Sequence, residues 1–115
     1  MTFSATTRQH GPATVIDLRG RVTLLEGEAL HDLCQDLIRE GKKLIVLNFR
    51  NVEYLDSSGI GQLVRSLFAA RRNNADICTV ELGVRSREIL RMANLHTVIG
   101  DFPDESSALE TLSAR

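Results

Sequence analysis

The sequence predicts an α/β fold in which helices pack on a mixed, mostly parallel sheet of four to five strands. Strand-like segments alternate with amphipathic helical segments along the chain, an order typical of parallel strands joined by crossover helices. The apolar run 44–47 suits a strand that is covered on both faces. Two strand-like segments precede the first helical segment, and this opening pair would make the sheet mixed.

The size and composition of the chain indicate one domain with an aliphatic core. The chain has 115 residues, of which 43% are apolar and 25% charged, which is ordinary for a folded domain. It contains four Phe, one Tyr and no Trp, so Leu, Ile and Val must supply most of the core. We therefore expect a single domain over residues 1–115.

The first half of the chain predicts two strands, a helix and a third strand. Residues 3–9 alternate weakly and fit an edge strand, and residues 13–19 form a better strand that Gly20 would end. Apolar residues from Leu30 to Ile38 recur with helical spacing, and Gly41 stands where a left-handed helix stop is expected. The run at 44–47 is the next strand.

The second half predicts three helices and two strands. A helical stripe starts at Ile60 and closes near residues 73–74, and a strand follows at 77–82. Ser86 is a candidate N-cap of a short helix, and residues 98–99 are expected to form a brief strand. The pair 103–104 would open a terminal helix with three apolar residues turned inward, which are Ala108, Leu109 and Leu112.

Charge, cysteines and hydropathy exclude several classes of function. The formal net charge is −1, so the chain lacks the basic field that holds nucleic acid. Cys34 and Cys78 are isolated and predict neither a disulfide framework nor a zinc site, and no other pattern predicts a cofactor. The sequence shows neither a secretory signal nor an apolar run long enough to insert into a membrane. We expect a cytoplasmic protein.

One short segment contains the candidate functional residues, and it lies between the expected buried strand and the helix that follows it. Asp56, Ser57 and Ser58 precede two glycines, Gly59 and Gly61. The first turn of a helix has unpaired backbone N–H groups and the positive end of the helix dipole. A hydroxyl there can be presented to a second protein, and the glycines would let a phosphate or a partner backbone approach closely.

The same residues also have a purely structural interpretation. Ser57 or Ser58 could cap the helix, and the glycines could serve packing of helix against strand. A small hydrolase that uses Ser57 is disfavoured, because His10, His31 and His96 lie in separate elements. The segment also lacks the GxSxG elbow and the Walker lysine.

Residues 52–61 resemble the signature of STAS domains, especially the stand-alone bacterial anti-sigma-factor antagonists. The resemblance extends to the strand before the signature, to a short helix and turn at 86–95 and to an acidic turn and helix at 101–112, so it covers nearly the whole chain. It implies a STAS fold with about four packed helices, and a binding protein rather than an enzyme.

The resemblance also implies a mechanism and partners. The serine that directly follows the aspartate is phosphorylated by a GHKL-type serine kinase, which is also the anti-sigma factor, and a PP2C-type phosphatase restores it. The matching residue is Ser57. The unphosphorylated antagonist would bind the kinase and release the sigma factor. The alternative is a STAS scaffold subunit of a transporter-associated or stress-sensing complex that does not switch, in which Ser57 acts only as a cap.

On this model Asp56 fixes the loop and contacts the partner, Ser58 caps the helix or assists docking, and Gly59 and Gly61 permit close approach. Weaker interface candidates are the positions of the following helix that are expected to be exposed, which are Gln62, Arg65 and Ser66.

Two segments depart from the family pattern. Residues 20–23 replace a Gly-Glu-Leu-Asp-like segment and lack its acidic position, which puts partner specificity in doubt. Residues 73–74 are Asn-Asn in place of a Gly-Gly turn, a mild change because Asn tolerates left-handed geometry.

Overall fold

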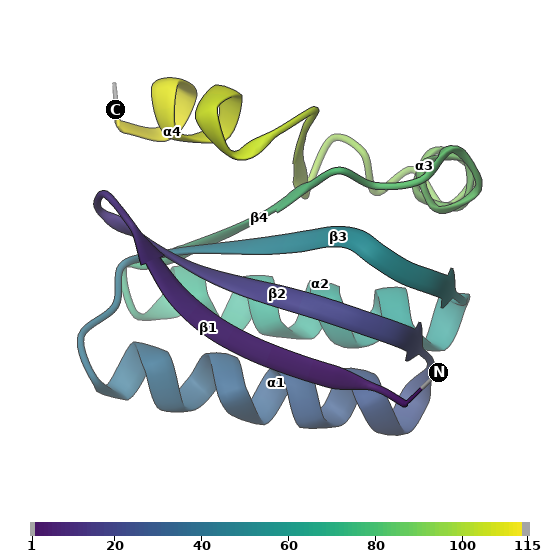
Figure 1. Cartoon of the computed structure of the whole chain (residues 1–115), viewed down its shortest axis with the longest axis horizontal. Coiled ribbons are helices and arrows are strands. Elements are labelled where there is room, and N and C mark those ends of the chain that lie inside the picture. Colours follow the sequence, from purple (N-terminus) through teal and green to yellow (C-terminus); the bar gives the residue numbers. More distant parts are fainter. Residues whose placement is uncertain (1, 114–115) are drawn as a thin grey trace.

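The computed structural model describes residues 2–113, along which strands and helices alternate after an opening strand pair (Figure 1). The elements are β1 (Ser4–His10), β2 (Ala13–Val22), α1 (Leu24–Arg39), β3 (Leu44–Leu55), α2 (Ser57–Arg72), β4 (Asp76–Val80), α3 (Val84–Met92), β5 (Gly100–Phe102) and α4 (Glu105–Ser113).

The strands form one mixed sheet in the order β1-β2-β3-β4-β5. β1 pairs antiparallel with β2, and every other neighbouring pair is parallel. The mixed sheet and the number of strands and helices confirm the predicted fold class, and β1 lies at the edge as expected.

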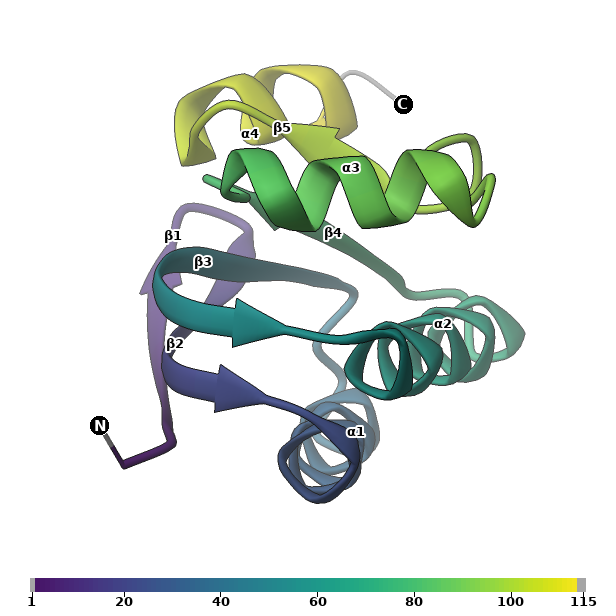
Figure 2. The same ribbon diagram turned by 90° about the vertical axis from the view of Figure 1, so that its right-hand side faces the viewer.

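Helices cover both faces of the sheet. α1 and α2 lie together on one face, and α4 lies on the opposite side (Figure 1). The turned view shows α3 near β4 and β5 and away from α1 and α2 (Figure 2). Helices on both faces of the sheet explain why β3 begins with a continuous apolar run.

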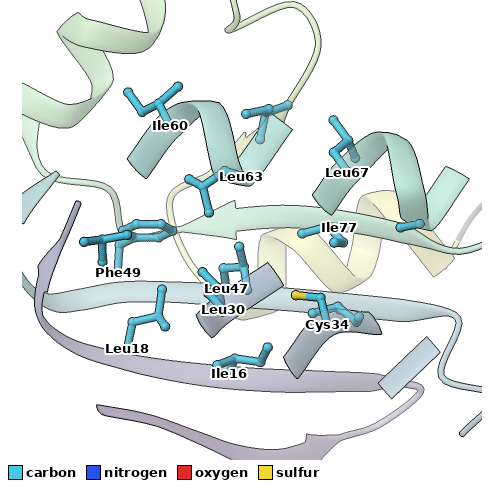
Figure 3. Close-up of a cluster of buried hydrophobic side chains, with 14 of the residues drawn as sticks. Ile16, Leu18, Leu30, Cys34, Leu47, Phe49, Ile60, Leu63, Leu67 and Ile77 are labelled. Carbon is cyan, nitrogen blue, oxygen red and sulfur yellow. The ribbon is translucent and has the colours of Figure 1, made fainter. Parts of the chain in front are cut away.

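The larger core fills the space between the sheet and the α1–α2 pair (Figure 3). It is aliphatic apart from one phenylalanine, Phe49, and the thiol of Cys34, as the composition predicted. Burial raises the pKa of the Cys34 thiol to about 12, so this sulfur is an inert part of the core. Cys78 is also buried, but it lies in the smaller cluster under α4.

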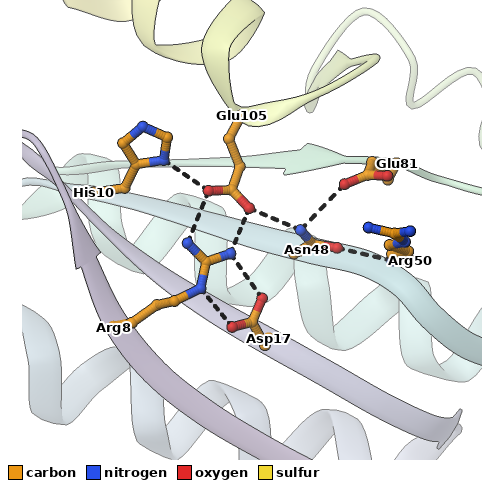
Figure 4. Close-up of polar contacts among 7 residues, drawn as sticks. All are labelled: Arg8, His10, Asp17, Asn48, Arg50, Glu81 and Glu105. Carbon is orange, nitrogen blue, oxygen red and sulfur yellow. Dashed lines mark hydrogen bonds and ion pairs between the residues drawn. The ribbon is translucent and has the colours of Figure 1, made fainter.

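A polar network holds α4 over the other face of the sheet (Figure 4). The Glu105 carboxylate at the start of α4 accepts hydrogen bonds from Arg8 on β1, at 3.0 Å to Oε1, and from Asn48 on β3, at 2.9 Å to Oε2. His10 Nδ1 lies 2.8 Å from Oε1. These contacts lower the pKa of Glu105 to about 2, chiefly through Arg8.

Several element boundaries differ from the sequence-based prediction. β2 does not end at Gly20 but continues to Val22, since Gly20 adopts a φ of 90° within a shift of register against β3. β3 extends from the predicted apolar run to Leu55. β4 spans Asp76–Val80 instead of the longer predicted segment.

Two local predictions near the C-terminal end were wrong. Ser86 does not cap α3, which starts at Val84 with Gly83 as its N-cap residue. Residues 98–99 form a turn in which both backbone N–H groups bond to the carbonyl oxygen of Leu95, and the strand follows at Gly100–Phe102. A short apolar run does not distinguish a strand from a buried turn.

The predicted ends of two helices were confirmed. Gly41 and Asn74 adopt positive φ angles of 90° and 59° just after α1 and α2. Within residues 2–113, no helix has the length and apolarity needed to cross a bilayer.

Candidate functional site

Helix α2 begins immediately after the buried end of β3, and Asp56 is its N-cap. The Asp56 backbone is extended, with φ −111° and ψ 179°, and its Oδ1 accepts a hydrogen bond from the Gly59 N–H at 2.9 Å. The aspartate therefore satisfies one of the unpaired donors of the first turn. This geometry contradicts the structural interpretation in which Ser57 or Ser58 caps the helix.

Ser57 and Ser58 are the first two residues of α2, and both are exposed. Within residues 2–113, neither hydroxyl has a hydrogen-bond partner, because Asp56 supplies the capping contact. The Ser57 Oγ is thus accessible to a second protein and is not needed to hold the helix.

The two glycines of the segment have different roles. A Cβ on Gly59 would lie 2.2 Å from the Val22 carbonyl oxygen and 3.0 Å from Leu55 Cδ1. Gly59 is buried and lets the first turn of α2 press against the end of β2, so its missing side chain serves packing inside the domain. Gly61 is exposed, and a Cβ there would meet no atom within 4 Å, so its surface is open to a partner.

The expected exposed face of α2 is only partly exposed. Arg65 is exposed, and Gln62 is half-buried because its side chain packs on Gly27 of α1. Ser66 is buried, which corrects the expectation of exposure: its Oγ donates to the Gln62 carbonyl oxygen at 2.9 Å and lies 2.9 Å from His31 Nδ1.

This serine–histidine pair is not a nucleophile with its base. Both side chains are buried between α1 and α2, and the hydroxyl is already engaged by the helix backbone. Burial lowers the pKa of His31, and the nearby Arg65 charge lowers it further. Within residues 2–113, no histidine forms a hydrogen bond with Ser57.

Ser57 lines a groove of about 340 Å³ between the β3–α2 junction and the N-terminal end of α3. The junction contributes residues 53–57, and α3 contributes Arg85, Ser86 and Ile89. Arg85 was not among the candidate site residues predicted from the sequence. Its place beside Ser57 follows from the packing of α3, for which no sequence pattern gave a signal.

The segment that departs from the family pattern lies next to this groove. Arg21, at the end of β2, stacks over the Tyr54 ring with its guanidinium carbon 4.4 Å from the ring centroid. Tyr54 is one of the groove residues. The lost acidic position is therefore replaced by a cation–π contact at the rim of the candidate site.

At the α2 N-terminus the helix backbone favours an anion on Ser57, and the neighbouring Asp56 carboxylate opposes it. The first turn carries no acidic residue beyond the capping Asp56. The unpaired backbone N–H groups and the positive end of the helix dipole are favourable to negative charge. A phosphate at this place would break no side-chain hydrogen bond within residues 2–113.

The family model described as "Mlab, STAS domain" matches residues 5–100, and the chain belongs to this family of STAS domains. No curated protein matches the sequence significantly.

Solved structures share the fold. An anti-sigma factor antagonist from Mycobacterium paratuberculosis has a TM-score of 0.85 and 17% identity, over 97% of this chain and 95% of that chain. The Bacillus cell fate determinant SpoIIAA in its phosphorylated form has a TM-score of 0.69 and 19% identity, over 96% and 99% of the two chains. A sulfate transporter family protein from Wolinella succinogenes has a TM-score of 0.77 and 17% identity, over 91% and 88%. At these identities the similarity shows the fold alone.

Proposed function

We propose that this protein is an anti-sigma factor antagonist that switches partners through phosphorylation of Ser57. The observation that carries the proposal is the state of the Ser57 hydroxyl, which is exposed at a helix N-terminus and bonded to no other described residue. The fold shared with anti-sigma factor antagonists, one of them in a phosphorylated form, supports it.

In the proposed reaction a GHKL-type serine kinase transfers the γ-phosphoryl group of ATP to Ser57 Oγ. A P–O bond forms at the serine, the bond to ADP breaks, and the hydroxyl proton is released. The product carries ~1.5–2 additional negative charges at pH 7. A PP2C-type phosphatase hydrolyses the ester and returns the serine.

The added charge acts on docking. A partner that offers carboxylates, or an anionic nucleotide already bound to it, is repelled by a phosphate at the centre of the contact. A loss of ~3 kcal/mol in binding free energy weakens affinity more than a hundredfold, which suffices for a switch. In the unphosphorylated form, Ser57, Ser58 and the open surface of Gly61 would contact the kinase, with Asp56 fixing the turn.

The test compares serine variants in phosphorylation and in binding. The unchanged protein is incubated with a GHKL-type kinase and ATP, and the modified residue is mapped by mass spectrometry. We expect phosphate on Ser57 and none in Ser57→Ala, while Ser58→Ala, which changes the equally exposed neighbour, is still modified. Ser57→Ala should bind the kinase in the presence of ATP, and Ser57→Asp should bind it weakly. Equal affinity of Ser57→Ala and Ser57→Asp would refute the mechanism.

A second candidate is a STAS subunit that serves a transporter-associated assembly without switching. The fold shared with a sulfate transporter family protein favours it. In that case the complex forms with the same affinity whether position 57 is serine, alanine or aspartate, and no serine is phosphorylated.

A further inference from the structure

We propose that the groove beside Ser57 is a phosphate pocket, in which Arg85 of α3 binds the phosphate once Ser57 carries it. The proposal rests on the proposed function, since it takes Ser57 as the phosphoacceptor. It adds a residue of the domain itself that holds the modified serine.

The first argument is proximity. Ser57 and Arg85 line the same groove of about 340 Å³, which opens between the β3–α2 junction and α3. Ser86 lies in the same lining and brings a second hydroxyl. A phosphate on Ser57 Oγ therefore forms at the edge of a hollow whose lining on the α3 side includes Arg85 and Ser86.

The second argument is that Arg85 is available. It is exposed and has no ion-pair partner within residues 2–113. Its neighbour Arg87 donates from Nε to Asp101 Oδ2 at 2.8 Å and is therefore engaged. A guanidinium fork matches the oxygens of a phosphate, and such charge-assisted bonds are stronger than neutral ones.

The third argument is the balance of charge in the groove. Among the described residues that line it, Arg85 is the only cation, whereas Glu53 and Asp56 are acidic. The first turn of α3 contains no acidic residue, and Gly83 provides no side-chain cap, so its backbone N–H groups add favourable potential. A new phosphate would be repelled by the two carboxylates, and Arg85 is the side chain that offsets them.

The consequence for the switch is that phosphorylation fills the groove. A phosphate bound by Arg85 is held at a fixed place across the β3–α2 junction instead of moving freely in solvent. The same step removes the free guanidinium from the surface that the unmodified protein offers to a partner.

The test introduces phosphoserine at position 57 during translation, so that no kinase is needed. The second pKa of the phosphate, ~6 for an unperturbed phosphoserine, is measured by ³¹P NMR titration. We expect Arg85→Gln to raise this pKa by roughly half a unit, the effect of one partly solvated ion pair. Arg85→Lys, which keeps the charge but loses the fork, should restore part of the shift.

The matched control is Arg91→Gln. Arg91 is exposed on the same helix but lines a different hollow, with Val84, Arg87 and Glu88. Equal phosphate pKa values in Arg85→Gln and Arg91→Gln would overturn the proposal. The melting temperatures of the unmodified variants verify that each is folded. The outcome is separable from the proposed function, because a kinase that ignores Ser57 would refute that function and leave this pKa difference intact.

Discussion

Replacement of Gly59 by alanine tests whether close packing against β2 fixes the segment that holds Ser57. The added Cβ would lie 2.2 Å from the Val22 carbonyl oxygen. Because this oxygen belongs to the backbone of Val22, it cannot move aside without displacing the end of β2. Overpacking of this kind costs ~1–3 kcal/mol. The higher helix propensity of alanine, worth ~1 kcal/mol over glycine, offsets part of that cost. We expect Gly59→Ala to lower the free energy of unfolding by ~1–3 kcal/mol.

The control is two residues away on the same helix. A Cβ on Gly61 would meet nothing within 4 Å, so Gly61→Ala should stabilise the protein by ~0.5–1 kcal/mol. Urea unfolding followed by circular dichroism measures both variants at constant m-value. If the two substitutions change stability in the same direction, the close approach of Gly59 to Val22 is not what places Ser57.

Three further predictions concern the cap and two titratable groups. Asp56→Ala should cost ~1 kcal/mol in urea unfolding because it removes the bond to the Gly59 N–H, and an unchanged midpoint would exclude the cap. Glu105 has a folded-state pKa of about 2, so its stabilising contribution is fully present above its unfolded pKa of ~4.3 and is lost as pH falls toward 2. Glu105→Gln should flatten the unfolding profile in that range, and a profile identical to that of the unchanged protein would contradict this. The pKa of His31 is lowered in the folded state, so stability should fall as pH drops below ~6.5. Urea midpoints at pH 7.5 and 5.5 for the unchanged protein and His31→Gln measure this, and equal dependence in both would show that another group titrates.

The order of elements could be predicted from the sequence because periodicity is local. The helical spacing of apolar residues from Leu30 to Ile38 indicates which face of that helix is buried. The apolar run that opens β3 likewise indicates a buried strand. Boundaries failed where tertiary contacts decide them. A glycine often ends a strand, but the positive φ of Gly20 is accommodated by a shift of register against β3, and the strand continues.

The candidate site was likewise predictable only in part. The segment that holds Asp56 and Ser57 could be found, because a strand, a polar turn and a helix follow one another directly. Which residue caps the helix could not, since aspartate and serine cap about equally well. Ser66 was misplaced because its exposure depends on the neighbouring α1, and Arg85 was overlooked because it reaches the site from a helix nearly thirty residues further along the chain.

The division of roles between Asp56 and Ser57 leads to a last prediction about how the proposed switch would work. The aspartate holds the first turn and the Ser57 hydroxyl makes no bond within residues 2–113, so a phosphate on Ser57 breaks no contact of the fold. The helix dipole favours the new charge by ~0.3–1 kcal/mol. We therefore expect the chain with phosphoserine at position 57 to be at least as stable in urea as the unmodified chain. A loss of more than ~1 kcal/mol, the size of a lost helix cap, would mean that phosphorylation releases a partner by loosening the domain rather than by changing the charge of its surface.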